Sequence, residues 1–261
     1  MIEINRKSLS AIGRKAGKYA LENKYRLVVD NSIKENLSTD IEKEMSKFYE
    51  SQLKKILDLP VITEENFQIK NNLGESEFWL VDSIDGTLSY IEGFLSYVTQ
   101  FALIRNGSVI YGLVYAPEYD LLYEGVYKCG AFKNGFKLSP ENQGRITTII
   151  DNTPTPSLFV RSLMNDFGIT NYVVSGSIGL KLCKVADGQA DIFVKLNSLE
   201  TWDVAPASLI LQEAGGLACN LDGSDFILEV GSKTKGIVGI KNNRRDFVDA
   251  IYATAENKFK A

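Results

Sequence analysis

The spacing of apolar residues changes near Phe78, and this change limits most strongly how the chain can fold. Before it, apolar residues recur at helical spacing from Leu9 to Tyr19, which predicts an amphipathic N-terminal helix. Thr39 with Glu42 three positions later resembles a capping box, so a second helix is expected to begin there and end near Leu57. The first part of the chain is therefore expected to be helical.

Strand signals follow. Phe78 to Val81 is an apolar run that predicts a strand ending at Asp82. Asn106-Gly107 and Asn134-Gly135 are dipeptides that favour tight hairpin turns between such strands. The segment from about 78 to 138 is therefore expected to form a mainly antiparallel sheet.

The remainder alternates strand and helix patterns after a polar, proline-containing stretch near 139–157. Strands are expected at 172–175, 191–194, near 217 and at 236–240, and helices over 177–186, 202–214 and from about 244. Gly215-Gly216 is a suitable stop for the second of these helices. The sequence thus predicts an N-terminal α+β half over 1–140 and a C-terminal α/β half over 141–261.

Composition excludes several kinds of chemistry. The chain has no histidine and only three cysteines, which are far apart, so imidazole-relayed nucleophiles, histidine-bound zinc and thiolate metal sites are not expected. A net charge of -4 without a basic block argues against a nucleic-acid polymer as partner. Neither a membrane span nor a signal segment is recognisable, so a cytoplasmic protein is expected. Hydrolysis by this chain would rely on carboxylates and hard cations.

The run Asp82-Ser83-Ile84-Asp85-Gly86-Thr87 carries the strongest chemical signal. A strand delivers Asp82 at its end and a sharp turn at Gly86 returns Asp85 to the same side, so both carboxylates and the Ile84 carbonyl can converge on cations. The free amides of Gly86 and Thr87 would suit a phosphate. The alternative is a solvated Asp/Gly turn, since short motifs occur by chance.

Two further acidic positions are candidates. Glu64-Glu65 follows an apolar stretch, although adjacent acidic residues are usually surface charge. Trp202-Asp203 opens an apolar helix, where an aspartate can simply complement the helix dipole. Together with Asp82 and Asp85 these residues supply the several oxygen ligands that one or two divalent ions need.

At this point the sequence resembles the inositol monophosphatase superfamily, with its three signatures in the family's order. They are Glu64-Glu65, Asp82 to Thr87, and Trp202-Asp203-Val204-Ala205 running into Glu213-Ala214-Gly215-Gly216. The resemblance covers nearly the whole chain from about Asp40. It implies a layered αβαβα sandwich of the inositol monophosphatase and fructose-1,6-bisphosphatase type, and two or three Mg²⁺ ions.

The resemblance also implies roles for individual residues. The metal ligands would be Glu64, Asp82, the Ile84 carbonyl, Asp85 and Asp203. Thr87 and Glu64 would position the attacking water, with Asp40 assisting near a third ion. Ser83 stands where the family usually has proline, which is expected to loosen the turn without removing a ligand.

Substrate choice depends on Lys195, which stands where inositol phosphatases of the family have a glutamate. A cation there suits a second phosphate. Members that hydrolyse 3′(2′),5′-bisphosphate nucleotides, of the CysQ type, are similar here and also near Lys181. The favoured substrate is adenosine 3′,5′-bisphosphate, cleaved to AMP, although both lysines could be merely solvated. The expected substrate contacts are Ile84, Asp85, Gly86, Thr87, Gly176, Ser177, Ile178, Lys181, Lys195 and Asp203.

Alternative interpretations of the function stay open. Leu88-Ser89-Tyr90 lacks the charged residue that bisphosphate nucleotidases commonly have after the D-G-T run, which weakens the substrate assignment. The nearest rival is an inositol, fructose or other sugar phosphatase on the same scaffold, and a more remote one is a non-catalytic nucleotide or metal sensor. A small phosphorylated metabolite is the expected partner, and the resemblance allows a homodimer.

Overall fold

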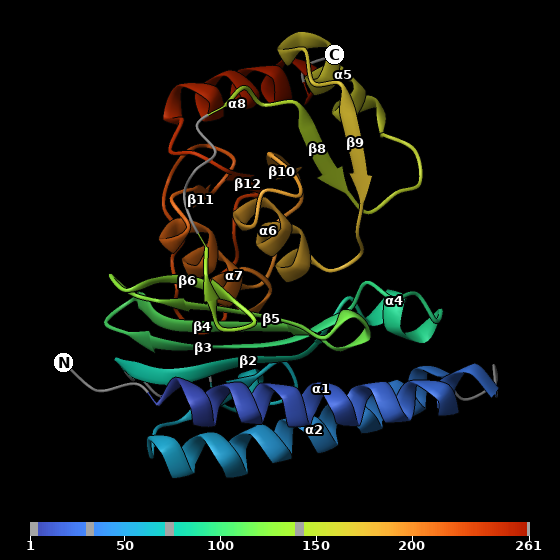
Figure 1. Cartoon of the computed structure of the whole chain (residues 1–261), viewed down its shortest axis with the longest axis vertical. Coiled ribbons are helices and arrows are strands. Elements are labelled where there is room, and N and C mark those ends of the chain that lie inside the picture. The colour runs from blue at the N-terminus through green and yellow to red at the C-terminus, as the bar shows by residue number, and fades with distance from the viewer. Residues whose placement is uncertain (1–4, 30–33, 71–75, 139–143, 260–261) are drawn as a thin grey trace.

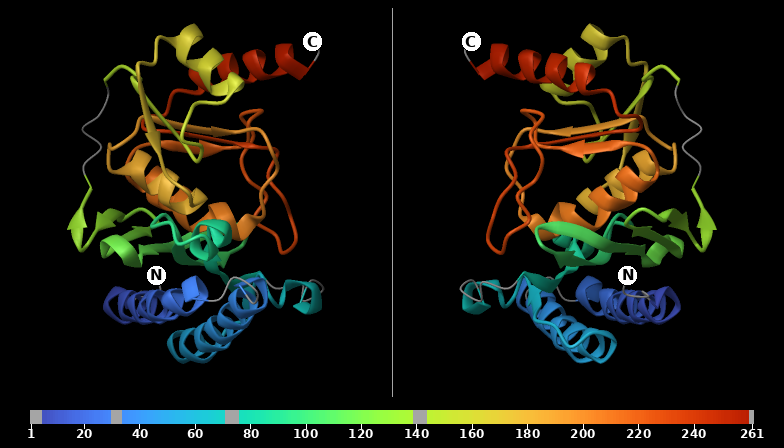
Figure 2. Two further views of the ribbon diagram at one scale, coloured as in Figure 1. Left: turned by 90° about the vertical axis from the view of Figure 1, so that its right-hand side faces the viewer. Right: turned by 90° about the vertical axis from the view of Figure 1, so that its left-hand side faces the viewer.

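The structure is a computed structural model that describes residues 5–29, 34–70, 76–138 and 144–259, with side chains over 5–24, 40–68, 76–138 and 144–255. Its helices and sheets alternate in five layers, α, β, α, β, α, which follow one another along the long axis (Figures 1 and 2). The predicted layered α/β sandwich is thus confirmed.

The first layer is a pair of long helices, α1 (Arg6–Val29) and α2 (Lys34–Ile56), packed on the outer face of the first sheet. Their apolar stripes are buried there, as Leu9 and Met45 show with 1% exposure each. The predicted start of the second helix at Thr39 is wrong, because α2 already includes the residues from Lys34. A Thr-x-x-Glu pattern can lie inside a helix when the residues before it also tolerate helical geometry. The side chain of Thr39 lies outside the described residues.

The first sheet has the strand order β1 to β7 as in the sequence, and only the β1–β2 pair is parallel. Its strands are β1 (Val61–Thr63), β2 (Glu77–Asp85), β3 (Val98–Arg105), β4 (Ser108–Ala116), β5 (Leu121–Val126), β6 (Gly130–Lys133) and β7 (Phe136–Lys137). Asn106 and Asn134 both have φ of 48° in two-residue turns, as the Asn-Gly dipeptides predicted. The mainly antiparallel sheet over 78–138 is therefore confirmed.

Strand β2 does not end at Asp82 as predicted but continues to Asp85. Asp82 pairs with Gln100 and Asp85 with Val98, so β2 advances three residues while β3 advances two. This extra residue is a β-bulge. In a regular strand, residues three apart point to opposite faces, and the bulge compensates for this by bringing both aspartates to the same side.

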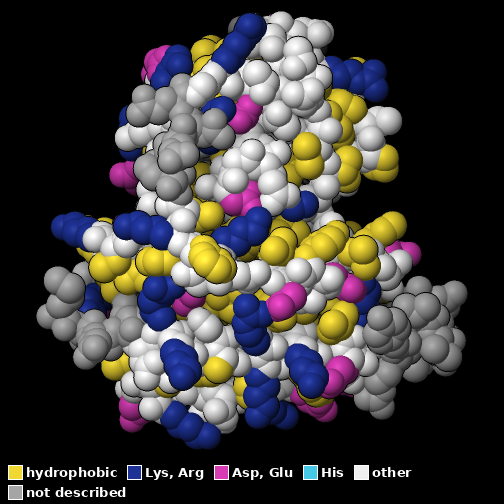
Figure 3. Space-filling view, in the orientation of Figure 1, with side chains coloured by type: hydrophobic (Ala, Val, Ile, Leu, Met, Phe, Trp, Pro, Cys, Tyr) yellow, Lys and Arg dark blue, Asp and Glu magenta, His cyan; other side chains and the backbone are white. Residues whose placement is uncertain are grey.

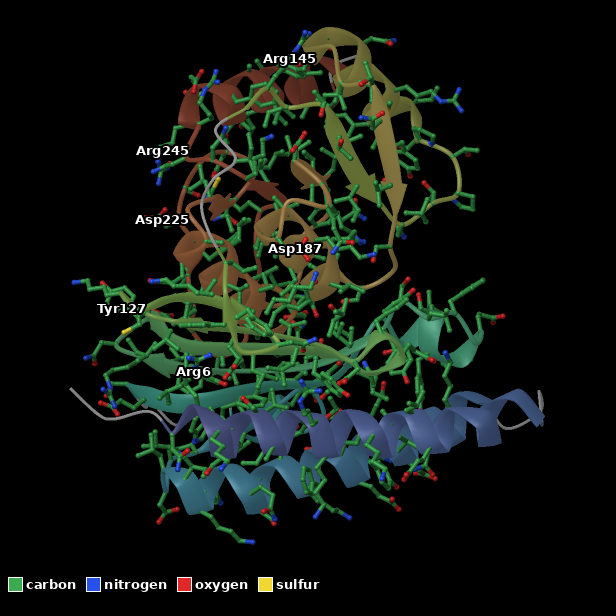
Figure 4. The ribbon with its side chains drawn as sticks, viewed as in Figure 1. Arg6, Tyr127, Arg145, Asp187, Asp225 and Arg245 are labelled. Atoms are coloured by element: carbon green, nitrogen blue, oxygen red, sulfur yellow. The ribbon has the colours of Figure 1, made fainter. Side chains whose placement is uncertain are left out.

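The middle layer consists of α6 (Ile178–Ala186) and α7 (Thr201–Glu213), which lie between the two sheets (Figures 1 and 2). Asp187, just after α6, ties that helix to the first sheet (Figure 4). It accepts hydrogen bonds from the Tyr123 hydroxyl at 2.8 Å and from Lys133 Nζ at 2.5 Å. These two bonds hold the C-terminal end of α6 against the first sheet.

The second sheet has the order β11-β12-β10-β8-β9 and is covered by the outer helices α5 (Leu158–Phe167) and α8 (Arg245–Phe259). Its strands are β8 (Thr148–Asp151), β9 (Asn171–Val174), β10 (Ile192–Lys195), β11 (Leu217–Cys219) and β12 (Ile237–Ile240). β8 and α5 were not predicted.

Strands of the first sheet end before residue 140 and those of the second begin after it, while α7 contacts both sheets. The division at 140/141 into two domains stays a prediction.

On the face shown in Figure 3, basic side chains predominate over α1 and α2, with fewer acidic ones among them. The short helix α4 (Thr87–Ile91) and the turn after it carry exposed apolar side chains, namely Leu88, Phe94 and Leu95. None of the helices in the described part of the chain is long and apolar enough to cross a membrane.

Candidate active site

Parallel pairing of β1 with β2 places Glu64 beside Asp82. Thr63 is in register with Val81, so the residues that follow each of them lie next to each other across the two strands. Asp82 is buried at 2% exposure, and its Oδ1 accepts the Ile84 amide at 3.1 Å. Glu64 lies at the exposed rim of the same region. One predicted ligand from each strand is therefore brought to the same end of the sheet.

Asp85 is held by the N-terminal end of α6. Its Oδ2 accepts the Ser177 hydroxyl at 2.5 Å and the Gly179 amide at 2.7 Å, and its Oδ1 accepts the Ile178 amide at 3.3 Å. Gly86, which follows, has φ of 93°, the left-handed conformation that a glycine adopts without strain. The two motifs Asp82–Thr87 and Gly176–Lys181 are joined by hydrogen bonds between residues 92 to 94 positions apart, and thus form one structural unit.

Asp203 comes from the first turn of α7, where Glu200 and Asp203 form a reciprocal capping box. Asp203 Oδ2 accepts the Glu200 amide at 3.0 Å. Asp203 therefore has a structural role at the start of α7, as a cap in addition to the expected partner of the helix dipole, but this bond occupies only one of its two carboxylate oxygens. Asp203 is close enough to Asp85 and Glu64 for their charges to raise its pKa, so it lies near the same cluster.

Burial raises the pKa of each of these four carboxyls above its ordinary value, and repulsion from neighbouring carboxylates adds to the rise for Glu64, Asp82 and Asp203. Burial is the largest cause for all four. Asp85, Glu64 and Asp203 then add to the pKa of Asp82, while the hydrogen bonds from α6 partly offset the rise at Asp85. Such a cluster is poorly stable as four free anions and would be relieved by protons or by a cation.

The donor set fits a hard divalent cation, since it consists of carboxylate and carbonyl oxygens without imidazole or thiolate. In their present orientations, no three acidic side chains of the described segments surround a point where one ion could be held. Several of their oxygens face protein donors instead, as the bonds of Asp85 show. An ionised carboxylate can accept protein donors and hold a cation at the same time, so metal binding would require these side chains to reorient toward the ion without losing the donors that hold them.

Thr87 contacts an acidic residue that sequence reasoning missed. Its hydroxyl lies 3.1 Å from Glu42 Oε1 on α2 and 3.1 Å from the Ile84 carbonyl oxygen. Burial raises the pKa of Glu42 to about 7, with Glu64 and Glu65 adding to the rise and the Thr87 hydrogen bond opposing it. Asp40, the predicted assistant, is exposed, and its Oδ1 lies 3.9 Å from Lys43 Nζ.

Two lysines lie beside the cluster. Lys181 is 1% exposed, and its Nζ donates to the Gly176 carbonyl at 3.0 Å and lies 4.9 Å from the centroid of the Phe193 ring. Burial lowers the pKa of Lys181 to about 8; Asp85 opposes this change and Lys195 contributes to it. Lys195, half-buried at the end of β10, is therefore close enough to Lys181 for the two charges to interact.

Three residues near the cluster were not predicted as functional: Glu42, Gln100 and Glu200. Glu42 had a signal, but it was interpreted as part of a helix cap. Gln100 is a single amide within the apolar strand β3, and a polar residue in a buried run is itself a signal that it has a specific partner. Glu200 precedes Trp202-Asp203 and shows its capping role only once α7 is placed.

The fold and the cluster together define a layered α/β protein with carboxylates from three distant stretches gathered beside a helix N-terminus. The chain belongs to the inositol monophosphatase family, which it matches over residues 2–256. It is 30% identical to inositol monophosphatase 1 of Bos taurus over 226 residues, which are 80% of this chain and 79% of that protein. It is also 29% identical to Nus factor SuhB of Pasteurella multocida over 67% of each chain.

Solved structures show the same fold. CysQ from Bacteroides thetaiotaomicron superposes with a TM-score of 0.79 and 19% identity over 93% of this chain and all of that one. Inositol monophosphatase-II from Staphylococcus aureus superposes with a TM-score of 0.76 and 23% identity over 94% of this chain and 92% of that one. The alignment with inositol monophosphatase 2 of Solanum lycopersicum, at 30% identity, spans 60% of this chain and 62% of that protein. The activity and substrate of the whole protein are therefore matters for proposal.

Proposed function

We propose that this chain is a Mg²⁺-dependent phosphomonoesterase whose substrate is a 3′(2′),5′-bisphosphate nucleotide such as adenosine 3′,5′-bisphosphate. The observation that carries the proposal is the convergence of Glu64, Asp82, Asp85 and Asp203 from β1, β2 and α7. Mutually repelling carboxylates of this kind are costly to maintain unless a ligand uses them. Membership of a family of phosphatases supports the reaction class.

Members of this family generally depend on Mg²⁺. We assign the ion or ions, two or three in number, to Glu64, Asp82, the Ile84 carbonyl, Asp85 and Asp203. When bound, Mg²⁺ would activate a water for attack on phosphorus and offset charge on the phosphate oxygens. The acidic side chains would contribute by holding the cation, and their repulsion would be relieved in doing so.

The Thr87–Glu42 pair would handle the proton of the attacking water. A carboxyl with a pKa of about 7 is suited to accept a proton near neutral pH. Thr87 Oγ, which donates to Glu42 Oε1, can pass a proton to that oxygen and take one from a water. Because α2 supplies Glu42 in contact with Thr87, we assign this role to Glu42 rather than to Asp40. Glu64 would help to orient the water.

Lys181 and Lys195 support a substrate with more than one phosphate. The two lysines repel each other, Asp85 and Asp151 offset part of the charge at Lys181, and a second phosphate would add an anion beside both lysines. Gly176, Ser177 and Ile178, at the start of α6, would line the same part of the site. Gly86 and Thr87 stay predicted contacts of the scissile phosphate.

An inositol monophosphatase activity is the second candidate, because curated relatives at 30% identity carry that name. The solved structures do not choose between the candidates. One of them is described as bound to 2′AMP and another as bound to inositol monophosphate, both for the same staphylococcal protein. A homodimer and a cytoplasmic location remain predictions.

A substrate panel tests the proposal. Phosphate release should be compared for adenosine 3′,5′-bisphosphate, inositol 1-phosphate and fructose 1,6-bisphosphate at one Mg²⁺ concentration. We expect the highest kcat/KM for the nucleotide, and Asp85→Asn, which loses a charged ligand, should reduce turnover of all three by about 100-fold or more. A clear preference for inositol 1-phosphate would overturn the nucleotide assignment, and release unaffected by Asp85→Asn would overturn the site.

A further inference from the structure

We propose that Gln100 is a positioning residue that holds the metal-binding carboxylates of β2 and α7 at their working separation. The inference rests on the proposed metal site and names a residue outside the predicted ligand set. Gln100 is fully buried on β3, directly opposite Asp82 in the antiparallel pair. It is thus the neighbour of one ligand and faces the helix that carries another.

The amide nitrogen of Gln100 joins the two elements. Nε2 lies 3.4 Å from Asp82 Oδ2, 3.2 Å from the Trp202 carbonyl oxygen and 3.3 Å from the Asp203 carbonyl oxygen. Its two N–H groups are shared among these three acceptors. Reversing the amide would turn Oε1 toward three other oxygens, so the orientation is fixed by electrostatics. One side chain therefore couples Asp82 to the first turn of α7.

The carbonyl oxygen of the Gln100 amide, Oε1, lies on the side of the cluster next to Asp85. Gln100 Oε1 is buried and has no hydrogen-bond partner within the described residues. It lies against Gly179, where an added Cβ would come within 2.3 Å of Oε1 and 3.3 Å of Asp85 Oδ2. Leaving a buried oxygen unpaired is unfavourable, so we expect Gln100 Oε1 to accept a hydrogen bond from a donor such as a water when the metal is bound.

Gln100→Met tests the proposal, because it keeps the length of the side chain and removes both polar ends. The melting temperature is followed as Mg²⁺ is titrated into metal-free protein, so the readout does not depend on activity. The half-saturating Mg²⁺ concentration (Kd) is obtained by fitting the rise in melting temperature to its logarithmic dependence on 1 + [Mg²⁺]/Kd. We expect it to rise about 10- to 100-fold, as when a residue that orients metal ligands is lost. The melting temperature in EDTA reports separately on folding.

Thr99→Val is the matched control. Thr99 is the adjacent residue of the same strand, is also buried, and shares a hydrogen bond with Tyr49 on the α2 side of the sheet. The variant Thr99→Val should lower the melting temperature in EDTA and leave the half-saturating Mg²⁺ concentration unchanged. If Gln100→Met does not fold, Gln100→Asn, which shortens the reach of the amide, should show the same weaker Mg²⁺ response.

The outcomes separate this proposal from the proposed function. Equal half-saturating Mg²⁺ concentrations in wild type and the folded Gln100 variant would overturn the role of Gln100 and leave the metal site standing. Absence of any Mg²⁺ shift in the wild type would instead overturn the metal site itself, and the Gln100 role with it.

Discussion

At the scale of single residues, Glu42 and Asp40 show how a helix selects one of two nearby acids. Residues two apart on an α-helix point in very different directions, so both cannot face Thr87. The structure turns Glu42 toward Thr87 and leaves Asp40 exposed near Lys43. The family resemblance pointed to Asp40, and the contact with Thr87 points to Glu42.

A pair of isosteric variants decides between them. Glu42→Gln keeps the shape of the side chain but cannot accept a proton, so kcat should fall by a factor on the order of 10². Asp40→Asn should leave kcat close to that of the wild type. Steady-state phosphate release at saturating Mg²⁺ measures both, and the reverse ranking would show that Asp40 is the functional acid.

At the scale of elements, α5 and α6 begin in the same way but differ in what their caps touch. Ser157 caps α5 by accepting the Val160 amide, and Ser177 caps α6 by accepting the Leu180 amide. Ser177 also donates its hydroxyl to Asp85 at 2.5 Å. The cap of α6 is therefore also part of the carboxylate cluster, whereas that of α5 is not.

Replacing each serine by alanine separates capping from site support. Both Ser157→Ala and Ser177→Ala should cost about 1 kcal/mol and lower the melting temperature in EDTA by about 2–4 °C. Only Ser177→Ala should also weaken the Mg²⁺ response, because Asp85 loses a donor that orients it. Equal Mg²⁺ responses in the two variants would count against a role for the α6 cap in the site.

Local patterns sufficed to predict most elements. The hairpins at Asn106 and Asn134 and the helices α6 and α7 follow from turn chemistry and periodicity, which depend on neighbouring residues only. β8 and α5 escaped prediction because both adjoin a proline-containing polar stretch whose local signal is that of a loop. The bulge in β2 also escaped, since it arises from pairing with β3 rather than from the sequence of β2 alone.

In the candidate site, too, some contacts could be predicted from local patterns and others could not. Asp82 and Asp85 are close in sequence, and their proximity could be predicted from one motif. The contacts of Gln100 with α7 and of Glu42 with Thr87 join residues 102 and 45 positions apart, respectively. Such contacts depend on how the layers are stacked, which a pattern within one segment does not encode.

At the scale of the whole molecule, the layers bring four carboxyls together, and their charge couples stability to pH. The pKa of each is raised in the folded state, and so is that of the neighbouring Glu42, which reaches about 7. A carboxyl with a raised pKa contributes stability below its unfolded value, and this contribution is lost as pH rises through the folded value. Without metal, the fold should therefore lose stability between about pH 4.5 and 8.

The melting temperature measured with EDTA and with millimolar Mg²⁺, at about pH 6 and about pH 8, tests most directly whether these carboxyls form one metal site. We predict a lower value at the higher pH in EDTA, and a Mg²⁺-induced rise that is larger at the higher pH, where protons compete less for the oxygens. Equal melting temperatures with and without Mg²⁺ at both pH values would contradict the account.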